Sequence, residues 1–281
     1  MHPKVSVYFD FNSTYSFLTS VRIYQICNGN SASVKPLHSQ YPLSSTDITH
    51  PTISKVRFEQ KPIEYGVLLA KSGQKGPPIT PGSTRANYTW IDLIRTLKKL
   101  GLDRDIGTPD SSWWPQKVSF PNRITYILSN RDVFAEGAKE LINNYKPENY
   151  DSSWRDIIID SGYTLEEAIT SEYVFRVYEK VFFEHVKITD WSVHVDILEK
   201  ILAKHPSASR GLGGSKTIIE LAKNSKTVRV ASFKPTQNAL ELGLFGIPTF
   251  VGDGDTFFWG NDHLTDAAIN VCQAQKNKSK L

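Results

Sequence analysis

Two serines near the start of the chain, Ser13 and Ser16, lie three residues apart in the stretch FDFNSTYSF. Residues 5–9 are β-branched or aromatic and predict a buried strand, and residues 15–26 carry apolar side chains at helical spacing. The step from a strand into a helix exposes the first N–H groups of the helix, which favour an anion. Two serines at this step have the spacing of a Cys-x-x-Cys redox pair. A hydroxyl forms no disulfide, but it can donate a hydrogen bond to the thiolate of another molecule.

A hydrogen bond from a serine hydroxyl to a thiolate lowers the pKa of the thiol, because it stabilises only the ionised form. One charge-assisted hydrogen bond contributes about 1.5–3 kcal/mol and lowers the pKa of the thiol by roughly one to two units. A thiol with an ordinary pKa of about 8.5 would then be largely ionised at neutral pH. A structural alternative remains open, because serine is also a common N-cap and Ser13 precedes a predicted helix.

A second motif, FGIPTFV at residues 245–251, bears on that choice. Gly246 precedes an Ile247–Pro248 step that enters a predicted strand, which is compatible with a cis peptide bond. That geometry leaves the N–H and C=O of Ile247 free for the backbone of a ligand. A strand followed by SxxS and a proline at the entry of a later strand together favour a thioredoxin-like site over a simple helix cap.

The composition is that of an ordinary globular protein. The chain has 281 residues, of which 33 are Lys or Arg and 29 are Asp or Glu, and this small surplus of positive charge does not indicate nucleic acid as a partner. No apolar run approaches the roughly 20 residues that cross a bilayer, so we expect no membrane insertion. Cys27 and Cys272 are isolated in the sequence, which excludes a dithiol oxidoreductase at the SxxS site and predicts no metal centre.

The final tripeptide, Ser279-Lys280-Leu281, matches the address read by the peroxisomal import receptor. It follows a polar, lysine-rich stretch at residues 273–278 that should be exposed. We therefore expect the protein in the peroxisomal matrix, with the import receptor as one partner.

The pattern of elements predicts an α/β fold interrupted by helices. A second strand is expected at residues 33–38, two strands at 248–251 and 255–259, and helices at 236–242 and 262–273. The stretch between the two ends is mainly helical, with loops at 73–81 and 107–115. We expect its helices at residues 88–100, 123–130, 133–144, 165–186 and 194–204. The resulting division assigns residues 1–44 and 225–281 to one sheet-containing domain and residues 45–224 to an inserted all-helical domain.

Two motifs resemble one known family. YFDFNSTYSFL, at residues 8–18, resembles the opening of the kappa-class glutathione transferases and the 2-hydroxychromene-2-carboxylate isomerases, which carry an aromatic-Asp motif followed by Ser-Pro-Tyr/Phe-Ser. LGLFGIPTFVGDGDTFFWGNDHL, at residues 242–264, resembles the second signature of the same family. The helix around Arg85, Tyr88, Asp92 and Arg95 and the step at residues 120–123 are similar as well, so weak similarity covers most of the chain.

This resemblance implies a thioredoxin-like domain of the DsbA type with a large inserted helical domain, a homodimer, and glutathione as co-substrate. Ser13 matches the serine that contacts the glutathione sulfur. The positions implied for glutathione binding are Ile247, Pro248, Asn261, Asp262, His263, Lys75 and Arg85, and the secondary positions are Tyr15, Ser16 and Asp92. No metal is implied.

Two residues depart from the family pattern. Thr14 stands where the family has proline, and His263 stands where it has arginine. An imidazole is a weaker or pH-dependent anchor for a carboxylate, because a guanidinium is always charged and an imidazole is not. Asp262 and His263 also suit the start of a helix and a solvated surface, respectively.

Three functions are compatible with these residues. The first is a kappa-type glutathione transferase, in which Ser13 holds glutathione as the thiolate for attack on a hydrophobic electrophile. The second is a glutathione-dependent cis/trans isomerase of the 2-hydroxychromene-2-carboxylate isomerase type, and the third is an inactive binding protein that keeps the thioredoxin fold. The predicted peroxisomal address favours the transferase and a detoxification role, because lipid oxidation products are electrophiles. The aromatic residues Trp113, Trp114, Trp154 and Tyr88 are expected in the helical core rather than in a pocket.

Overall fold

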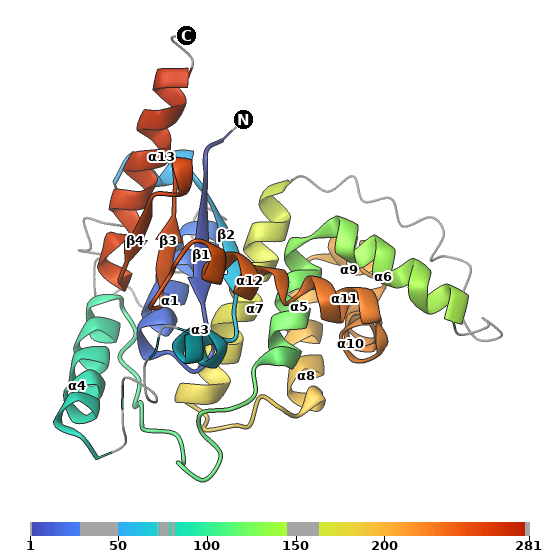
Figure 1. The fold of residues 1–281 in the computed structure, drawn as a ribbon. Helices are drawn as coiled ribbons and strands as arrows, with labels where there is room; N and C mark the ends of the chain where they lie inside the picture. Colours follow the sequence, from blue (N-terminus) through green and yellow to red (C-terminus); the bar gives the residue numbers. More distant parts are fainter. Residues whose placement is uncertain are drawn as a thin grey trace.

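The computed structural model describes residues 2–28, 50–71, 73, 79, 82–144 and 163–278. Helices surround a small sheet, and the two ends of the described chain lie at the same end of that sheet (Figure 1). The elements are, in chain order, β1 (Lys4–Phe9), α1 (Thr14–Asn28), η1 (Ile53–Lys55), β2 (Arg57–Pro62), α3 (Tyr65–Lys71), α4 (Thr84–Lys99), α5 (Ser119–Ser129), α6 (Arg131–Asn144), α7 (Tyr163–Phe182), α8 (Trp191–Leu202), α9 (Pro206–Gly211), α10 (Gly214–Asn224), α11 (Lys226–Ala231), α12 (Lys234–Glu241), β3 (Thr249–Val251), η3 (Asp253–Asp255), β4 (Phe257–Trp259), η4 (Asn261–His263) and α13 (Leu264–Lys278).

The sheet has the strand order β2-β1-β3-β4. β1 runs parallel to β2 and antiparallel to β3, and β3 runs antiparallel to β4. The chain therefore forms a βαβ unit, then a block of helices, and then a ββα unit that completes the same sheet. This arrangement confirms the thioredoxin-like fold with a large helical insertion.

β2 corrects one prediction. It lies within residues 45–224, which we expected to be all-helical, yet it pairs with β1 from Lys4–Arg57 to Phe9–Pro62. Its sequence, RFEQKP, alternates between buried and half-buried positions, but charged side chains occupy the half-buried positions and Gln60 occupies a buried one, so its apolar signal is weak. The strand predicted at residues 33–38 lies outside the described residues. The boundaries of the two proposed domains stay a prediction.

Most of the predicted helices are confirmed within a few residues, as α4, α5, α6, α7, α8, α12 and α13. Residues 107–115 form no helix or strand, as expected. Three helices between residues 206 and 231 were not predicted. Two of these, α9 and α11, span six residues each, which is too short for a clear helical period.

The two faces of the sheet pack against different helices. Val5 and Val7 lie on one face with Phe250, in a cluster that includes residues of α13. Tyr8 points to the other face, where it packs with Leu68 of α3 and with residues of α12. Because side chains alternate along a strand, β1 is buried on both faces, and its C-terminal end is fixed in position for the turn that follows.

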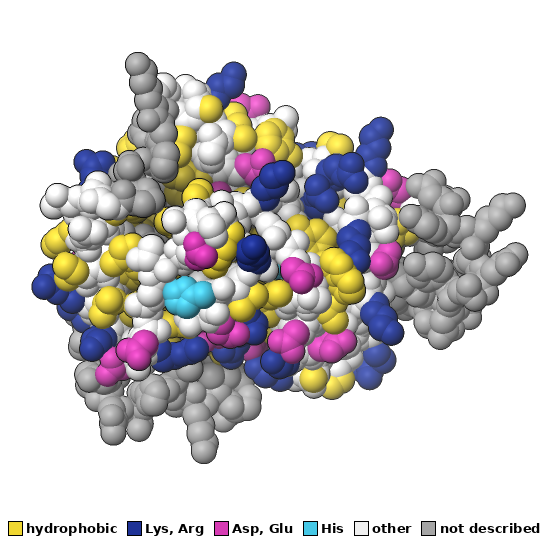
Figure 2. Space-filling model, turned by 90° about the horizontal axis from the view of Figure 1, so that it is seen from below, with side chains coloured by type: hydrophobic (Ala, Val, Ile, Leu, Met, Phe, Trp, Pro, Cys, Tyr) yellow, Lys and Arg dark blue, Asp and Glu magenta, His cyan; other side chains and the backbone are white. Residues whose placement is uncertain are grey.

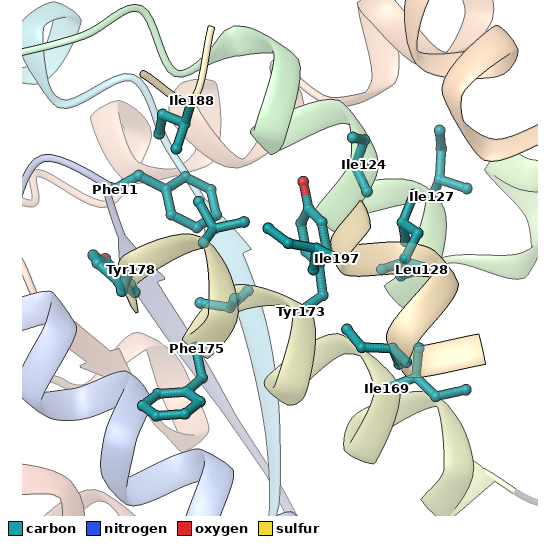
Figure 3. Close-up of a cluster of buried hydrophobic side chains, with 14 of the residues drawn as sticks. Phe11, Ile124, Ile127, Leu128, Ile169, Tyr173, Phe175, Tyr178, Ile188 and Ile197 are labelled. Atoms are coloured by element: carbon teal, nitrogen blue, oxygen red, sulfur yellow. The ribbon is translucent and has the colours of Figure 1, made fainter. Parts of the chain in front are cut away.

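The largest core surrounds α7, which supplies Tyr173, Phe175 and Tyr178, all of them closed to solvent. Figure 3 shows these side chains next to Phe11 and to isoleucines from α5 and α8. α7 also packs against α1. The helical insertion and the sheet therefore share one continuous core at α1. No helix in the described ranges combines the length and the apolar character needed to cross a bilayer.

Candidate functional site

Ser13 lies at the step between β1 and α1. Its Oγ accepts a hydrogen bond from the N–H of Ser16 at 3.1 Å, so Ser13 is the N-cap of α1. A hydroxyl has two acceptor lone pairs and one proton, and capping uses only a lone pair. Among the described residues no acceptor takes the proton of Ser13 Oγ, and Ser13 is only partly buried. The capping and ligand-binding interpretations are therefore compatible, because the same hydroxyl can still donate to an incoming anion.

The two serines differ. Ser16 is 1% exposed, and its hydroxyl lies against Tyr178 of α7 in the core. The partly exposed Ser13 is the one that a ligand can reach.

The Ile247–Pro248 peptide bond is cis, as the sequence predicted. It precedes β3, and β3 runs antiparallel to β1 with Tyr8 opposite Thr249. The end of β1 that leads to Ser13 thus lies beside the beginning of β3. In the described part of the chain, neither the N–H nor the C=O of Ile247 has a hydrogen-bond partner. This backbone is therefore available to a ligand that extends from the start of α1.

The segment after β4 is held next to the same strand. The N–H of Gly260 donates to the C=O of Pro248 at 3.0 Å. The guanidinium of Arg22, a buried residue of α1, donates to the C=O of Asn261. Ser13, Ile247 and the turn at Asn261 are separated in the sequence and are linked here through α1 and β3.

His263 is partly engaged already. Its Nδ1 lies 2.8 Å from Oδ2 of Asp266 in the first turn of α13, and its side chain is 43% exposed. A ligand therefore meets the Nε2 edge of a ring that Asp266 orients. Asp262 beside it is exposed.

Tyr15 and Asp92, which the resemblance assigned to secondary positions, are in direct contact. The hydroxyl of Tyr15 donates to Oδ2 of Asp92 at 3.2 Å, which ties α1 to α4. Burial, and after it the charge of Asp92, raises the pKa of Tyr15. Arg85 lies in the first turn of α4 and is exposed. Lys75 lies outside the described residues.

Asp10 is a buried acid at this step that the sequence analysis did not select. Its carboxylate accepts hydrogen bonds from the N–H of Asn12 at 2.8 Å, the side-chain amide of Asn12 at 3.0 Å and the N–H of Tyr65 at 2.9 Å. Burial raises the pKa of Asp10 to about 6, although these hydrogen bonds oppose the shift. The backbone N–H of Ser13 donates to the C=O of Asp10 at 3.0 Å, so Asp10 holds the turn that carries Ser13. The sequence did contain a signal for Asp10, because an acidic residue directly follows the predicted buried strand.

Aromatic side chains from α4 and the segment before α5 pack, as Tyr15 does, against the core around α7. The rings of Trp90 and Trp114 are 6.4 Å apart and both are partly buried. Tyr88 is 57% exposed, so its predicted place in the helical core is wrong. Trp154 lies outside the described residues. Figure 2 shows this end of the molecule, where hydrophobic side chains lie among charges of both signs rather than within a field of one sign.

The cysteines are separate from this site. Burial raises the pKa of Cys27 to about 12, and Cys272 packs at the edge of the cluster around α13. Within the described ranges, no group of histidine, cysteine and acidic residues could hold a metal ion.

Two solved structures have this architecture over almost the whole chain. A 2-hydroxychromene-2-carboxylate isomerase matches with a TM-score of 0.57 at 18% sequence identity, covering 99% of this chain and 98% of that one. A probable DsbA oxidoreductase from Streptomyces coelicolor matches with a TM-score of 0.54 at 13% identity, covering 98% of this chain and 91% of that one. No protein-family model and no curated protein sequence matches the chain. At these identities the likeness establishes the fold, which is the DsbA-like thioredoxin fold.

Proposed function

We propose that the protein is a glutathione transferase of the kappa type. The observation that carries the proposal is the hydroxyl of Ser13, which caps α1 with a lone pair and keeps its proton for a ligand. It lies at the end of β1, beside the free backbone of Ile247 that precedes a cis proline. A partly exposed donor and an unpaired backbone amide and carbonyl at one sheet end suit a small peptide with a thiol.

Ser13 stabilises the thiolate of glutathione in this proposal. The hydroxyl donates one charge-assisted hydrogen bond, and the N-terminus of α1 adds its partial positive charge. Together these interactions lower the pKa of the thiol by about one to two units. The thiol proton passes to water. The thiolate then forms a bond to an electrophilic carbon, and the displaced electron pair leaves with the leaving group or, after addition to a conjugated carbonyl compound, takes up a proton from water.

Each part of the peptide has residues that suit it. The N–H and C=O of Ile247 pair with the peptide backbone, as an added strand would. Asn261 and Asp262 are suited to the γ-glutamyl end, with Asp262 accepting from its ammonium group. His263 offers the Nε2 edge of its ring to a carboxylate, while Asp266 orients the ring through Nδ1. Arg85 and Lys75 remain proposed contacts that rest on the family resemblance.

A glutathione-dependent isomerase is the second candidate. It is favoured by the likeness to a 2-hydroxychromene-2-carboxylate isomerase over 99% of this chain. The thiolate would add to a conjugated carbonyl compound and leave again after rotation about the resulting single bond, so Ser13 has the same role in both reactions.

Calorimetric titration of the purified protein with glutathione at several pH values tests both enzyme candidates. We expect binding that saturates at millimolar glutathione or below. Absence of binding at millimolar glutathione would contradict both enzyme candidates. The remaining candidate would then be an inactive binding protein that has kept the thioredoxin fold. Conjugation assays and cis/trans isomerisation assays on the same preparation then separate transferase from isomerase.

We also propose a homodimer in the peroxisomal matrix, on the basis of the family resemblance and of Ser279-Lys280-Leu281. Light scattering should give a mass close to twice 31.7 kDa. Removal of the last three residues of a tagged protein should release it into the cytosol. An unchanged punctate distribution would show that this tripeptide is not the address.

A further inference from the structure

The side chain of Asn12 joins two segments that are far apart in the sequence. Its Oδ1 accepts a hydrogen bond from the N–H of Gln116 at 2.8 Å, and its Nδ2 donates to the C=O of Gln116 at 3.0 Å. The side-chain amide of Asn12 thus bonds both the N–H and the C=O of Gln116, in the same way as a backbone amide and carbonyl of a neighbouring β-strand would. Asn12 lies immediately before Ser13, so this pairing attaches the segment before α5 to the turn that carries the proposed nucleophile-binding serine.

Asp10 fixes the orientation of that amide. Its Oδ1 accepts from both the backbone N–H and Nδ2 of Asn12. A carboxylate can only accept, so Nδ2 must face Asp10, and Oδ1 must then face the N–H of Gln116. The opposite orientation of the amide would leave an oxygen against the carboxylate.

Gln116 extends the connection to the helical region. Its Oε1 accepts a hydrogen bond from the N–H of Ile188 at 2.7 Å, and its side chain is 9% exposed. Ile188 is fully buried before α8. Gln116 is therefore held by Asn12 through its backbone and by the helical region through its side chain.

The segment held in this way carries Trp114, two residues before Gln116. Trp114 lies beside Trp90 of α4, and α4 is tied to α1 by the bond between Tyr15 and Asp92. Displacing Gln116 would move Trp114 relative to Ser13. In Figure 1 this segment, drawn in green, runs past the end of the sheet where α1 begins.

We propose that Asn12 is a positioning residue. Its side-chain amide, oriented by Asp10, fixes the segment of Trp114 and Gln116 as one wall of the site, against which the second, apolar substrate binds. The effect on the second substrate rests on the proposed glutathione-dependent function; the fixing of the segment does not.

Hydrogen exchange of wild type, Asn12→Ala and Asn130→Ala tests the fixing of the segment without any ligand. Asn130 is the matched control, because it is also partly buried and bonds a backbone N–H, that of Val133, at a helix junction away from Ser13. We expect the amides of Gln116 and Ile188 to exchange about tenfold faster in Asn12→Ala, but not in Asn130→Ala. The N–H of Gln116 loses its acceptor, Asn12 Oδ1, and the N–H of Ile188 keeps its acceptor, Gln116 Oε1, on a segment that Asn12 no longer holds. Unchanged exchange of both amides, or equal acceleration in Asn130→Ala and in the core amides of α7, would overturn the proposal.

Steady-state kinetics with glutathione and 1-chloro-2,4-dinitrobenzene then test the effect on the second substrate. We expect the KM for the electrophile to rise about fivefold or more in Asn12→Ala, with the glutathione affinity and the thiolate absorbance of wild type retained. An unchanged KM would overturn the role of Asn12 as a wall support. Loss of thiolate absorbance in Asn12→Ala would overturn it as well, because Asn12 would then act on the thiolate itself. Failure of wild type to bind glutathione would contradict the proposed function instead, and the exchange result would still decide whether Asn12 holds the segment.

Discussion

The start of α1 is partly open to solvent and the interior of α7 is closed to it, and different interactions hold the two regions. In the core between α1 and α7 the rings of Phe17, Tyr178 and Phe182 are stacked: Phe17 lies on Tyr178 and Phe182 at centroid distances of 5.3 and 5.4 Å. Around Ser13 the contacts are hydrogen bonds between segments distant in sequence: Asp10 accepts from the N–H of Tyr65, and Asn12 pairs with Gln116. Apolar packing does not depend strongly on the orientation of the groups in contact, whereas a hydrogen bond requires its donor and acceptor to have a defined orientation. The first region supplies stability, and the second orients polar groups at the proposed site.

Loss of packing in the aromatic core should have the largest effect. Phe17→Ala removes a ring that is 0% exposed and that contacts Tyr178, Phe182 and Phe183. We expect the free energy of unfolding to fall by about 3–5 kcal/mol, because both burial and packing are lost. Urea denaturation measures this. A loss below about 1 kcal/mol would show that the stacked rings are not a main source of stability.

Protonation of the buried His194 should have the next largest effect. Burial lowers its pKa from 6.5 to about 4, and it bonds Tyr173 and the C=O of Ile188 in the neutral form. The unfolded chain binds a proton below pH 6.5 and the folded chain does not, so stability falls between pH 6.5 and 4, by about 3.5 kcal/mol. His194→Gln should lack this slope in urea denaturation across that range. An equal slope in wild type and variant would contradict the assignment.

Asp10 should give a slope of the opposite sign. Burial raises its pKa from 3.8 to about 6, so the folded chain binds a proton that the unfolded chain has released. The contribution of Asp10 to stability is therefore greatest below pH 3.8 and falls by about 3 kcal/mol as the pH rises to 6. The difference in unfolding free energy between wild type and Asp10→Asn should follow this trend. A difference independent of pH would show that Asp10 does not titrate in this range.

The bond between Tyr15 and Asp92 should contribute least. Tyr15→Phe removes the hydroxyl and leaves the ring, so we expect a loss of about 0.5–1.5 kcal/mol in unfolding free energy. Tyr88→Phe is the control, because Tyr88 is exposed on the same helix as Asp92. Equal stability of the two variants would indicate that this bond does not hold α1 to α4.

The sequence predicted the parts of the molecule that depend on local pattern. The strand–helix step at Ser13, the cis bond before Pro248 and the long periodic helices each have a signal within a few residues. β2 escaped prediction because its buried positions include Gln60, and a polar residue there weakens the alternation on which a strand prediction depends.

The contacts that assemble the site had no such signal. Asn12 and Gln116 are 104 residues apart, and their pairing depends on where tertiary packing brings the segment before α5. The contact between Tyr15 and Asp92 was anticipated only as two separate positions through the family resemblance. Long-range hydrogen bonds of this kind follow from the fold and not from spacing in the sequence.

The pKa of the glutathione thiol bound to wild type, Ser13→Ala and Ser13→Asp is the most direct test of the central claim, and the ultraviolet absorbance of the thiolate reports it. Ser13→Asp keeps an acceptor for the N–H of Ser16 and hence the helix cap, but an ionised carboxylate cannot donate to a thiolate. We predict a pKa about one to two units below that of free glutathione in wild type, and loss of most of that depression in both variants, because only the N-terminus of α1 still acts on the thiolate. A thiol pKa as low in both Ser13 variants as in wild type would contradict the role of Ser13.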